Sequence, residues 1–441
     1  MLYRLLLLIV KISIRIYHRK IQVKGFEKIP LNCPLLLASN HPNAFMDAIM
    51  LISFFPRRVY ALARSDVFNS PFKRKLFSYL DIMPIYRLQD GTDQLHKNSE
   101  IFEKCYSLLE KQAAILIFPE GVCIQERRLR KLRKGLARIA FGAEEVGNYN
   151  LGLNIIPVGI NYTKPAHHGG DVFLQIGSPI EIWNYTEAYK QEKSKSINRL
   201  TNDLESEMAK LIVIIEDPED DELLSNIEIL AENALLESAV NELTPEKKFI
   251  LSRSITKGLN ELKKNPLAYA ELRQKINNFF ASIIREEMSL EVLNKEVLQK
   301  SKLELLYPKL LILLFTFPIF FTGLILNYIP YHLPYLLSKK IVRNNIEFFA
   351  SINFSIGIVI FIGYYLILAG ITAVFTHIGF VLIILIAGPF TGKYALNYRS
   401  LYLKASAINS MKNKPEFVKK LMKEKEEILE MLGSVIPLSP N

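Results

Sequence analysis

The chain turns from a strand into a helix within the stretch Ser39-Asn40-His41-Pro42-Asn43-Ala44-Phe45-Met46-Asp47. The apolar run Pro34 to Ala38 before it predicts a short buried strand. Pro42 fixes its own φ and has no amide proton, so a helix can begin just after it but cannot run through His41. Asn43 is a residue of the N-cap type, and helix-forming residues follow it. The sequence therefore places His41 at a strand-to-helix corner of an α/β protein.

Asp47 lies in the second turn of this expected helix. Six positions on one helix would separate two side chains by about 240°, so only a histidine in the preceding loop can fold back to meet the carboxylate. A histidine held by a carboxylate is a general base with a fixed tautomer. The alternative is a surface histidine beside a helix-start carboxylate, and the pair alone leaves both interpretations open.

The composition limits the class of protein. The chain has 441 residues, half of them apolar, and a formal net charge of +11. Such a length has room for two or three folding units. A basic balance suits a nucleic acid or an anionic membrane surface, and we expect the membrane because long apolar segments are present and no nucleic-acid-binding motif is. Three scattered cysteines without a CxxC pair predict neither a disulfide framework nor a zinc site and fit a reducing compartment.

The N-terminal residues 1–19 are apolar but are interrupted by Arg4, Lys11 and Arg15. The stretch is too short to span a bilayer comfortably and has no small-residue cleavage site of a signal peptide. We expect a helix at the membrane interface, with an uncleaved anchor as the second choice.

Residues 20–185 alternate strand-like and helical stretches, which predicts an α/β domain with a mostly parallel sheet. The expected strands are Pro34–Ala38, Val59–Ala63, Met83–Tyr86, Ala114–Phe118, Ile155–Ile160 and Val172–Ile176. The expected helices are Ser70–Tyr79, Thr92–Lys111 and Leu132–Glu145.

An α-helical region follows in residues 186–304, where amphipathic helices are separated by breaks before Pro218, Pro245 and Pro266. Its composition does not distinguish a lid, a spacer and a partner-binding unit.

Residues 305–396 are predicted to form membrane segments. Leu310–Leu326 is at the short end for a span, and Phe348–Phe390 is long enough for two helices of about 20 residues. Basic residues flank the longer block on both sides, which predicts a hairpin with both ends cytoplasmic. The segment containing Pro318 would then be re-entrant or paired with the N-terminal helix, because three full spans would put the tail outside. Residues 397–441 are expected to be a cytoplasmic tail with one amphipathic helix, Lys412–Leu432.

Four short blocks with chemical character follow one another along residues 30–180. The first is the corner with His41 and Asp47. The others are the strand ending at Arg87, the strand Ile117-Phe118 closing on Pro119-Glu120-Gly121, and the proline-containing strand Asn154–Ile160. Each block alone is weak evidence, but the four in this order and spacing are specific.

These blocks resemble the four motifs of the glycerolipid acyltransferase family, which includes glycerol-3-phosphate and lysophosphatidic acid acyltransferases. The first motif of that family usually has four residues between its His and Asp, whereas this chain has five, with a Pro-Asn pair after the histidine. Relatives resembling the fungal glycerol-3-phosphate and dihydroxyacetone-phosphate acyltransferases share the longer spacing. Cys123 stands where the family commonly has a small or hydroxyl residue.

The resemblance implies transfer of an acyl group from a thioester to a glycerol hydroxyl. His41 would be the base and Asp47 would orient it, while backbone amides at the helix start after Pro42 are candidate donors to the oxyanion. Arg87 is the expected cation for a phosphate-bearing acceptor. By the same resemblance, Glu120 and Gly121 would position the glycerol portion of the acceptor. Asn40, Phe118 and Pro119 are counted with them as substrate-binding residues.

Simpler interpretations stand beside these. Arg87 is alternatively a solvated residue at a strand end, and Glu120 a turn residue. Most of the basic run Arg127–Lys134 is expected to be a solvated helix face, while some members could bind phosphate, the charged part of an acyl carrier or anionic lipid. His167 and His168 fit a hairpin turn better than a metal site. His377 is expected at the membrane interface, although an intramembrane ionisable residue remains a functional candidate.

The sequence thus predicts a membrane-bound enzyme with its α/β catalytic domain on the cytoplasmic side. It would move a fatty acyl group from acyl-CoA or acyl-carrier protein to glycerol 3-phosphate or to a lysophospholipid such as lysophosphatidic acid. No metal and no bound cofactor are expected. Two other classes stay open: an acyl-thioester hydrolase that uses the same histidine and aspartate on water, and a non-catalytic membrane adaptor whose working part is residues 186–304.

Overall fold

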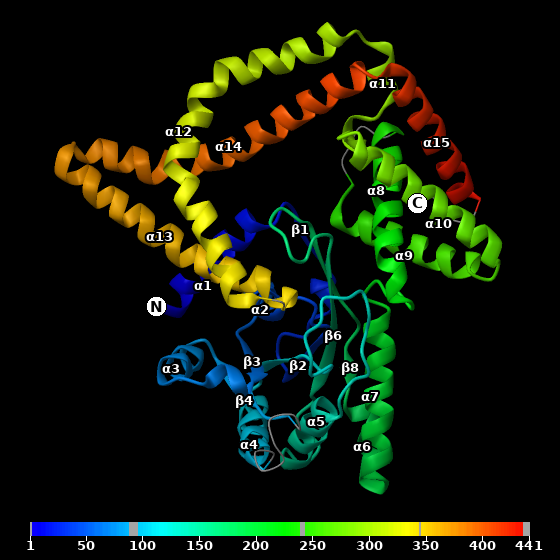
Figure 1. Ribbon diagram of the computed structural model, residues 1–441. Helices are drawn as coiled ribbons and strands as arrows, with labels where there is room; N and C mark the ends of the chain where they lie inside the picture. The colour runs from blue at the N-terminus through cyan, green and yellow to red at the C-terminus, as the bar shows by residue number, and fades with distance from the viewer. Residues whose placement is uncertain (1, 88–95, 239–242, 344, 435–441) are drawn as a thin grey trace. The chain divides into compact units, whose positions relative to one another are not determined.

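The structure is a computed structural model that describes residues 2–87, 96–238, 243–343 and 345–434 (Figure 1). The chain divides into two compact units, and each is described by itself. The first unit consists of Met1–Glu216 together with Asn344–Ile352, and the second consists of Asp217–Arg343 together with Asn353–Asn441. The first unit is therefore built from two stretches that are far apart in the sequence.

A mixed sheet forms the centre of the first unit. Its strands lie in the order β1-β7-β6-β2-β5-β3-β4, and a short β8 pairs with β6. All pairings are parallel except those of β6 with β7 and β8. The strands are β1 (Ile21–Lys24), β2 (Leu35–Ser39), β3 (Val59–Arg64), β4 (Ile82–Ile85), β5 (Ala114–Ile117), β6 (Asn154–Tyr162), β7 (Val172–Ile176) and β8 (Ile180–Glu181).

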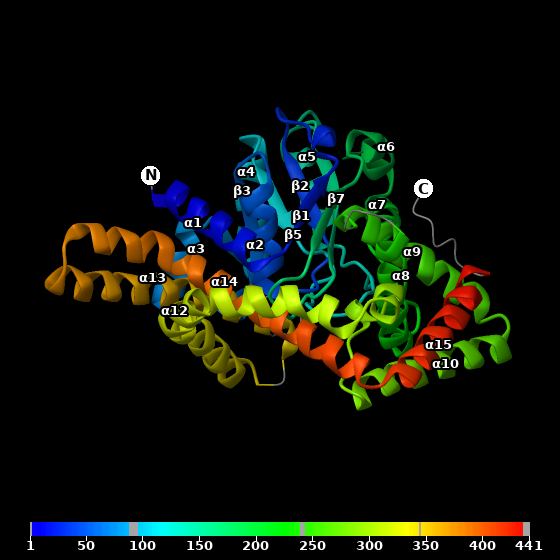
Figure 2. The ribbon, with the colours of Figure 1, turned by 90° about the horizontal axis from the view of Figure 1, so that it is seen from above.

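Helices cover both faces of this sheet. Every residue of β2 and β5 is buried, as expected for parallel strands that are covered on both sides. The helices of the unit are α1 (Leu2–Tyr17), α2 (Ala44–Phe54), α3 (Pro71–Tyr79), α4 (Lys97–Glu110), α5 (Gly135–Val146), α6 (Trp183–Gln191) and α7 (Lys193–Ala209). Figure 2 shows α1 and α2 lying side by side.

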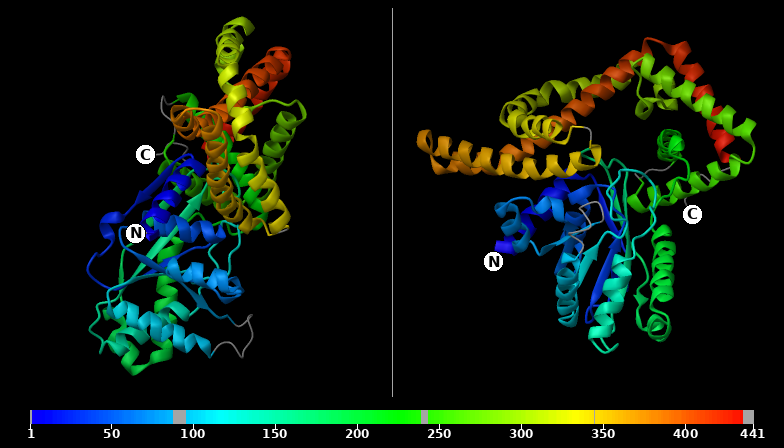
Figure 3. Two further views of the ribbon diagram at one scale, coloured as in Figure 1. Left: turned by 90° about the vertical axis from the view of Figure 1, so that its left-hand side faces the viewer. Right: turned by 60° about the horizontal axis from the view of Figure 1, so that its bottom comes forward.

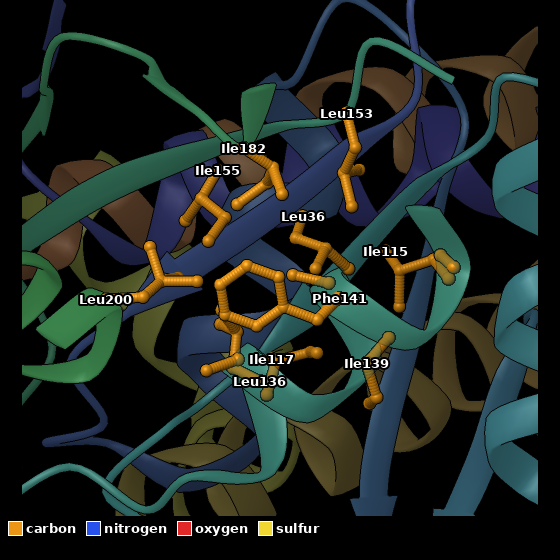
Figure 4. Close-up of a cluster of buried hydrophobic side chains, with 14 of the residues drawn as sticks. Leu36, Ile115, Ile117, Leu136, Ile139, Phe141, Leu153, Ile155, Ile182 and Leu200 are labelled. Carbon is orange, nitrogen blue, oxygen red and sulfur yellow. The ribbon is translucent and has the colours of Figure 1, made fainter. Parts of the chain in front are cut away.

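The main hydrophobic core lies between the sheet and α4, α5, α6 and α7, which are neighbours in the right-hand view of Figure 3. Phe141 of α5 is fully buried there and stacks on Tyr189 of α6, with ring centroids 4.1 Å apart. Figure 4 shows Phe141 surrounded by aliphatic side chains from the strands and helices. Burying one such aromatic side chain contributes about 1.5–3 kcal/mol, so this core fixes the sheet that carries the site.

The predicted α/β class with a mostly parallel sheet is confirmed, and each of the six expected strands is present within a few residues of its expected bounds. The sequence analysis missed β1 and β8, which have four and two residues. The helix expected from Thr92 begins at Lys97 in the described part of the chain, and residues 92–95 lie outside it. The basic run Arg127–Lys134 precedes α5 as a loop, so the expectation of a helix face there is wrong.

The second unit is helical. Its helices are α8 (Asp221–Ser238), α9 (Pro245–Leu262), α10 (Pro266–Arg285), α11 (Lys295–Gln299), α12 (Lys302–Val342), α14 (Ile378–Lys412) and α15 (Pro415–Gly433), together with most of α13 (Phe349–Phe375), which begins in the first unit. Side chains of Ser, Thr or Asn cap several helix starts, including those of α9, α10, α11 and α12. The α-helical character predicted for this region is confirmed.

Three helices among the described residues are long and apolar enough to cross a membrane. They are Lys302–Val342, Ile346–Phe375 and Ile378–Lys412. The expected pair of helices in the longer apolar block is present, with the break at His377. Helix α12 is longer than predicted because it continues through four prolines, and it is visibly bent in Figure 1, as helices commonly are at proline. The predicted domain boundaries at residues 19, 185, 304 and 396 stay predictions.

A buried amide joins the apolar helices α12, α13 and α14. Asn327 of α12 is 3 % exposed and donates to the carbonyl oxygens of Gly323 and Gly388, while its own Oδ1 accepts from the hydroxyl of Tyr365. The backbones approach closely here, because a Cβ on Gly323 would lie 2.2 Å from the carbonyl oxygen of Thr391. Small residues and polar side chains of this kind hold helices together where water is absent.

Candidate active site

The site lies where the parallel strands of the first unit end. Strands β2, β5, β3 and β4 all run in the same direction, so the residues that follow them emerge at one edge of the sheet. His41 follows β2, Phe118 to Gly121 follow β5, and Arg87 follows β4. Ligands of open α/β sheets bind outside the carboxyl ends of the strands.

His41 and Asp47 meet as the sequence predicted. The Nδ1 atom of His41 lies 2.9 Å from Oδ2 of Asp47, with the histidine in the loop and the aspartate on α2. The side chain of His41 is 18 % exposed and that of Asp47 is fully buried. Because Nδ1 is engaged by the carboxylate, Nε2 is the ring nitrogen that can accept a proton from a substrate.

Asp47 is held by two further hydrogen bonds. The backbone amide of Asn43 donates to Oδ2 at 2.7 Å, and the hydroxyl of Tyr162 donates to Oδ1 at 2.8 Å. The pKa of Tyr162 lies well above its usual value because the hydroxyl is buried and faces the Asp47 carboxylate. The hydroxyl therefore stays protonated and remains a donor to Asp47.

Tyr162 is the residue of this site that the sequence analysis missed. The fourth motif was expected to end as a strand at Ile160, whereas β6 continues to Tyr162. Strand β6 is parallel to β2, so its carboxyl end also reaches the edge that carries His41. A tyrosine two residues beyond an expected parallel strand was the available signal.

Phe118 lies against the imidazole of His41. The two ring centroids are 3.9 Å apart and the planes are inclined by 15°, which is a stacked arrangement. Stacking fixes the plane of the imidazole, and an apolar face beside it excludes water from one side of the base. The expected substrate-binding residue Phe118 therefore contacts the histidine directly.

Glu120 connects two parts of the site through backbone amides. Its Oε1 accepts from the amide of His41 at 3.2 Å, and its Oε2 accepts from the amide of Arg130 at 3.0 Å. Burial raises the pKa of Glu120, and the two amides oppose that rise. The next residue, Gly121, has φ of +71°, where a side chain would be strained. The Pro-Glu-Gly turn thus ties the corner at His41 to the basic loop.

Asn40 holds β2 against the end of β6. Its Nδ2 donates to the carbonyl oxygen of Ile160 at 3.0 Å, and its Oδ1 accepts from the amide of the same residue at 2.8 Å. Pro119 plays a similar part, since its carbonyl oxygen accepts from the amide of Arg133 at 2.7 Å. In the structure, both expected substrate-binding residues have backbone partners within the chain.

Arg87 lies at the same edge but not beside the histidine. Strands β5 and β3 lie between β2 and β4. At the usual spacing of neighbouring strands, the ends of β2 and β4 are therefore about 14 Å apart. That distance joins the backbone ends of the two strands, and the long side chain of Arg87 can bridge part of it toward an acceptor at His41.

The amides at the start of α2 have partners within the chain. The amide of Asn43 donates to Asp47, that of Ala44 donates to Sγ of Cys123 at 3.1 Å, and that of Met46 donates to Oγ of Ser351 at 3.0 Å. Three amides around the start of α2 are therefore engaged in this structure, and the assignment of oxyanion donors at this helix start stays a prediction. Burial raises the pKa of the Cys123 thiol, so it acts here as a neutral acceptor.

The loop after the Pro-Glu-Gly turn carries concentrated positive charge. Glu126 pairs with Arg130 at 2.8 Å and lies 3.8 Å from Arg128. One carboxylate thus faces two of the six cations in the run Arg127–Lys134. Among the described residues, no group of three or more His, Cys, Asp and Glu side chains could hold a metal ion. His167 and His168 lie in the turn that joins the antiparallel strands β6 and β7, as expected.

Comparisons with known proteins identify the family that the first unit resembles. Residues 20–161 match the model of the Acyltransferase family. The 1-acyl-sn-glycerol-3-phosphate acyltransferase LPAT1 of Arabidopsis thaliana is 29 % identical over 130 residues, which are 29 % of this chain and 35 % of that protein. The glycerol-3-phosphate O-acyltransferase 2 of Saccharomyces cerevisiae is 25 % identical over 147 residues, which are 31 % of this chain and 19 % of that protein.

An uncharacterized acyltransferase of Schizosaccharomyces pombe, C1718.04, is 28 % identical over 183 residues, covering 41 % of this chain and 26 % of its own length. The chain therefore aligns with well under half of each of these three relatives. Its residues 20–161 form an acyltransferase-family domain, and the resemblance to glycerolipid acyltransferases is confirmed.

Among solved structures, the 1-acyl-sn-glycerophosphate acyltransferase PlsC of Thermotoga maritima is similar over 47 % of this chain and 82 % of its own. The sequence identity is 18 % and the TM-score is 0.33.

Proposed function

We propose that this protein is a membrane-bound glycerolipid O-acyltransferase. It transfers a fatty acyl group from acyl-CoA or acyl-carrier protein to glycerol 3-phosphate or to a lysophospholipid such as lysophosphatidic acid. The observation that carries the proposal is the bond between Nδ1 of His41 and the fully buried Asp47 at the carboxyl edge of an acyltransferase-family sheet.

In this mechanism, Nε2 of His41 takes the proton of the acceptor hydroxyl. The hydroxyl oxygen bonds to the carbonyl carbon of the thioester, the tetrahedral intermediate collapses, and the carbon–sulfur bond breaks. The imidazolium then gives its proton to the departing thiolate. Asp47 holds the ring in the correct tautomer and stabilises the imidazolium, as a buried carboxylate does in other histidine-based sites.

The acceptor and donor sites are proposed from charge. Arg87 at the end of β4 and the basic loop Arg127–Lys134 are the cations for the acceptor phosphate or for the charged part of the donor. Neither a metal nor a resident cofactor has a role in this chemistry. The apolar helices would hold the catalytic unit at a membrane, and we propose that it faces the cytoplasm.

The test is acyl transfer by the full-length protein purified in detergent. Labelled acyl-CoA and acyl-carrier protein are offered separately with glycerol 3-phosphate and with lysophosphatidic acid. We expect transfer to one acceptor, loss of turnover in His41→Ala, and a loss of about 10³–10⁴-fold in kcat in Asp47→Asn, because the amide would favour the wrong histidine tautomer.

The same assay separates the alternatives. Release of free fatty acid without an acylated product would identify a thioester hydrolase instead. A folded protein that turns over no donor and acceptor pair, or a His41→Ala variant with full activity, would contradict the proposal and favour a membrane adaptor.

A further inference from the structure

The helix that carries Asp47 starts without the cap that its own sequence offers. Asn43 occupies the N-cap position of α2, but its side chain makes no capping hydrogen bond. The Nδ2 atom of Asn43 donates instead to the carbonyl oxygen of Pro165 at 2.8 Å. The first amides of a helix have no partner inside the helix, so another group must accept from them.

Ser351 supplies that group from a distant part of the chain. Its Oγ accepts from the amide of Met46 at 3.0 Å and donates to the carbonyl oxygen of Asn43 at 2.8 Å. The Met46 amide is shared, because it also donates to the carbonyl oxygen of Asn43 at 3.0 Å. Its side chain is fully buried. The first bond is that of a capping serine, and the second fixes the carbonyl group of the N-cap residue; both reach across more than 300 positions of the sequence.

Ser351 lies in the first turn of α13, one of the three apolar helices. Residues 344–352 belong to the first unit, and the start of α13 lies next to α2 in Figure 1. Phe348, just before α13, packs edge to face on Phe45 of α2, with ring centroids 6.4 Å apart. Two independent contacts therefore fasten this segment to the helix start.

Asn43 connects the contacts of Ser351 to the pair formed by His41 and Asp47. Asn43 is bonded to Ser351 through its carbonyl oxygen and to Asp47 through its amide. Between Asn43 and Phe45, Ala44 has φ of +42°, a left-handed conformation that costs free energy in a residue with a side chain. Such a conformation persists where surrounding bonds hold it, and the contacts of Ser351 and Phe348 lie on both sides of it.

We propose that Ser351 is a positioning residue of the acyl-transfer site and that residues 345–352 complete that site. This inference rests on the proposed function. It means that the geometry of His41 and Asp47 is set in part by the first turn of an apolar helix that lies outside the family-matched residues 20–161. A fragment ending at Glu216 would contain the catalytic pair but not its support.

The experiment compares three full-length variants in detergent. Ser351→Ala removes the hydroxyl, Ser351→Thr keeps it, and Ser355→Ala removes an exposed hydroxyl one turn further along α13 as the matched control. We expect Ser351→Ala to lower kcat by about tenfold to a hundredfold with KM for both substrates unchanged, since a small misplacement of catalytic groups has effects of that size. Ser351→Thr should recover most of the loss, and Ser355→Ala should match the wild type.

A second readout does not depend on turnover. The rate at which diethyl pyrocarbonate modifies His41, followed by mass spectrometry of its peptide, should rise in Ser351→Ala because the ring is held less firmly. Thermal unfolding shows whether each variant is folded. Wild-type kcat and an unchanged modification rate in Ser351→Ala would overturn the inference while leaving the proposed function intact. A wild type without transfer activity would refute the proposed function, and the modification rate would still decide the role of Ser351.

Discussion

Tyr162 supports, through a single hydrogen bond, the carboxylate of Asp47 that holds the proposed catalytic base His41. The tyrosine hydroxyl lies 2.8 Å from Oδ1 of the buried aspartate, which has its other oxygen occupied by His41 and the amide of Asn43. Removing the hydroxyl would leave one oxygen of a buried carboxylate without its donor, which is unfavourable in a site of low dielectric.

We therefore expect Tyr162→Phe to lower kcat by about tenfold, with a smaller change in KM, because the orientation of the base is loosened rather than the binding of substrate. Tyr185→Phe is the matched control, since Tyr185 donates an equivalent 2.8 Å bond to Asp203 away from the site. Steady-state kinetics of both variants measure the difference. Equal kcat values for Tyr162→Phe and the wild type would show that the bond is dispensable.

His18 makes the first unit sensitive to acid. It follows α1, is 2 % exposed and lies against the ring of Tyr162. Burial lowers the pKa of His18 from 6.5 to about 4. As pH falls through this range, the unfolded chain binds a proton that the folded chain does not, so the free energy of unfolding decreases.

Between pH 7 and pH 4 this single group is expected to remove about 3 kcal/mol of stability. Thermal unfolding measured across that range should fall more steeply for the wild type than for His18→Gln, which has no proton to gain. The comparison uses the slopes, because the substitution also changes packing. Parallel pH dependences in the two proteins would show that His18 does not remain neutral.

At the scale of single residues, the sequence predicted the contact that forms within one short stretch of the chain. His41 and Asp47 are six residues apart, and the proline between them forced the loop geometry that brings them together. Tyr162 and Ser351 come from 115 and more than 300 positions away, and nothing in the stretch around His41 predicts their contacts with it. Their contribution depends on strand order and on the return of the chain to the first unit, which are tertiary features.

At the scale of the elements, α12 and α14 pack closely through small residues. Gly323 of α12 lies so close to Thr391 of α14 that a Cβ would meet the carbonyl oxygen at 2.2 Å. Gly363 of α13 has no atom within 4 Å of an added Cβ, and both glycines are helical. Alanine at Gly323 would therefore disturb the packing of α12 on α14, whereas alanine at Gly363 would change only the helix propensity of α13.

Gly323→Ala is expected to lower the thermal stability of the detergent-solubilised protein, because α12 and α14 would have to move apart. Gly363→Ala should leave stability unchanged or raise it by up to about 1 kcal/mol, the usual gain of alanine over glycine in a helix. Unfolding of the two variants side by side is the measurement, and equal stability in both would contradict the close approach of α12 and α14.

Element types were predictable where the hydrophobic pattern was long and regular, as in the six expected strands and the two helices either side of His377. The sequence analysis ended the segment Leu310–Leu326 too early, because α12 continues through Pro330 and Pro334 although prolines usually end helices. Neighbouring helices can satisfy the backbone groups that proline frees in an apolar setting.

At the scale of the whole molecule, the two-part construction of the first unit constrains how the chain meets a membrane. The chain leaves this unit after Glu216 and rejoins it by Asn345. An α/β unit with loops and sheet edges must lie on one side of a bilayer, because hydrocarbon cannot satisfy its backbone groups. The residues between these two points must therefore cross the bilayer an even number of times. Among the described residues of that stretch, α12 is the one candidate span, so an even number means that α12 does not cross.

The remaining two candidates would then form a pair of crossings. Lys302 bonds to Asn413 at 3.0 Å, so the end of α14 lies beside the start of α12 within the second unit. The side of the membrane on which each segment end lies can be measured with single cysteines, in a chain whose three native cysteines are replaced by alanine. The cysteines are placed one at a time at Ser301, Asn345, His377 and Asn413. We expect an impermeant maleimide added to sealed vesicles to label 301, 345 and 413 alike, and 377 from the opposite side.

Different labelling of positions 301 and 345 would show that α12 crosses and that the catalytic unit is not built as described. With equal labelling, α12 enters and leaves through a single leaflet, and its bend becomes the turning point of a loop dipped into the lipid. The catalytic unit would then share a leaflet with the acyl chains of its proposed lipid acceptor and product. An acyl chain could pass between the site and that leaflet without its head group ever crossing the bilayer.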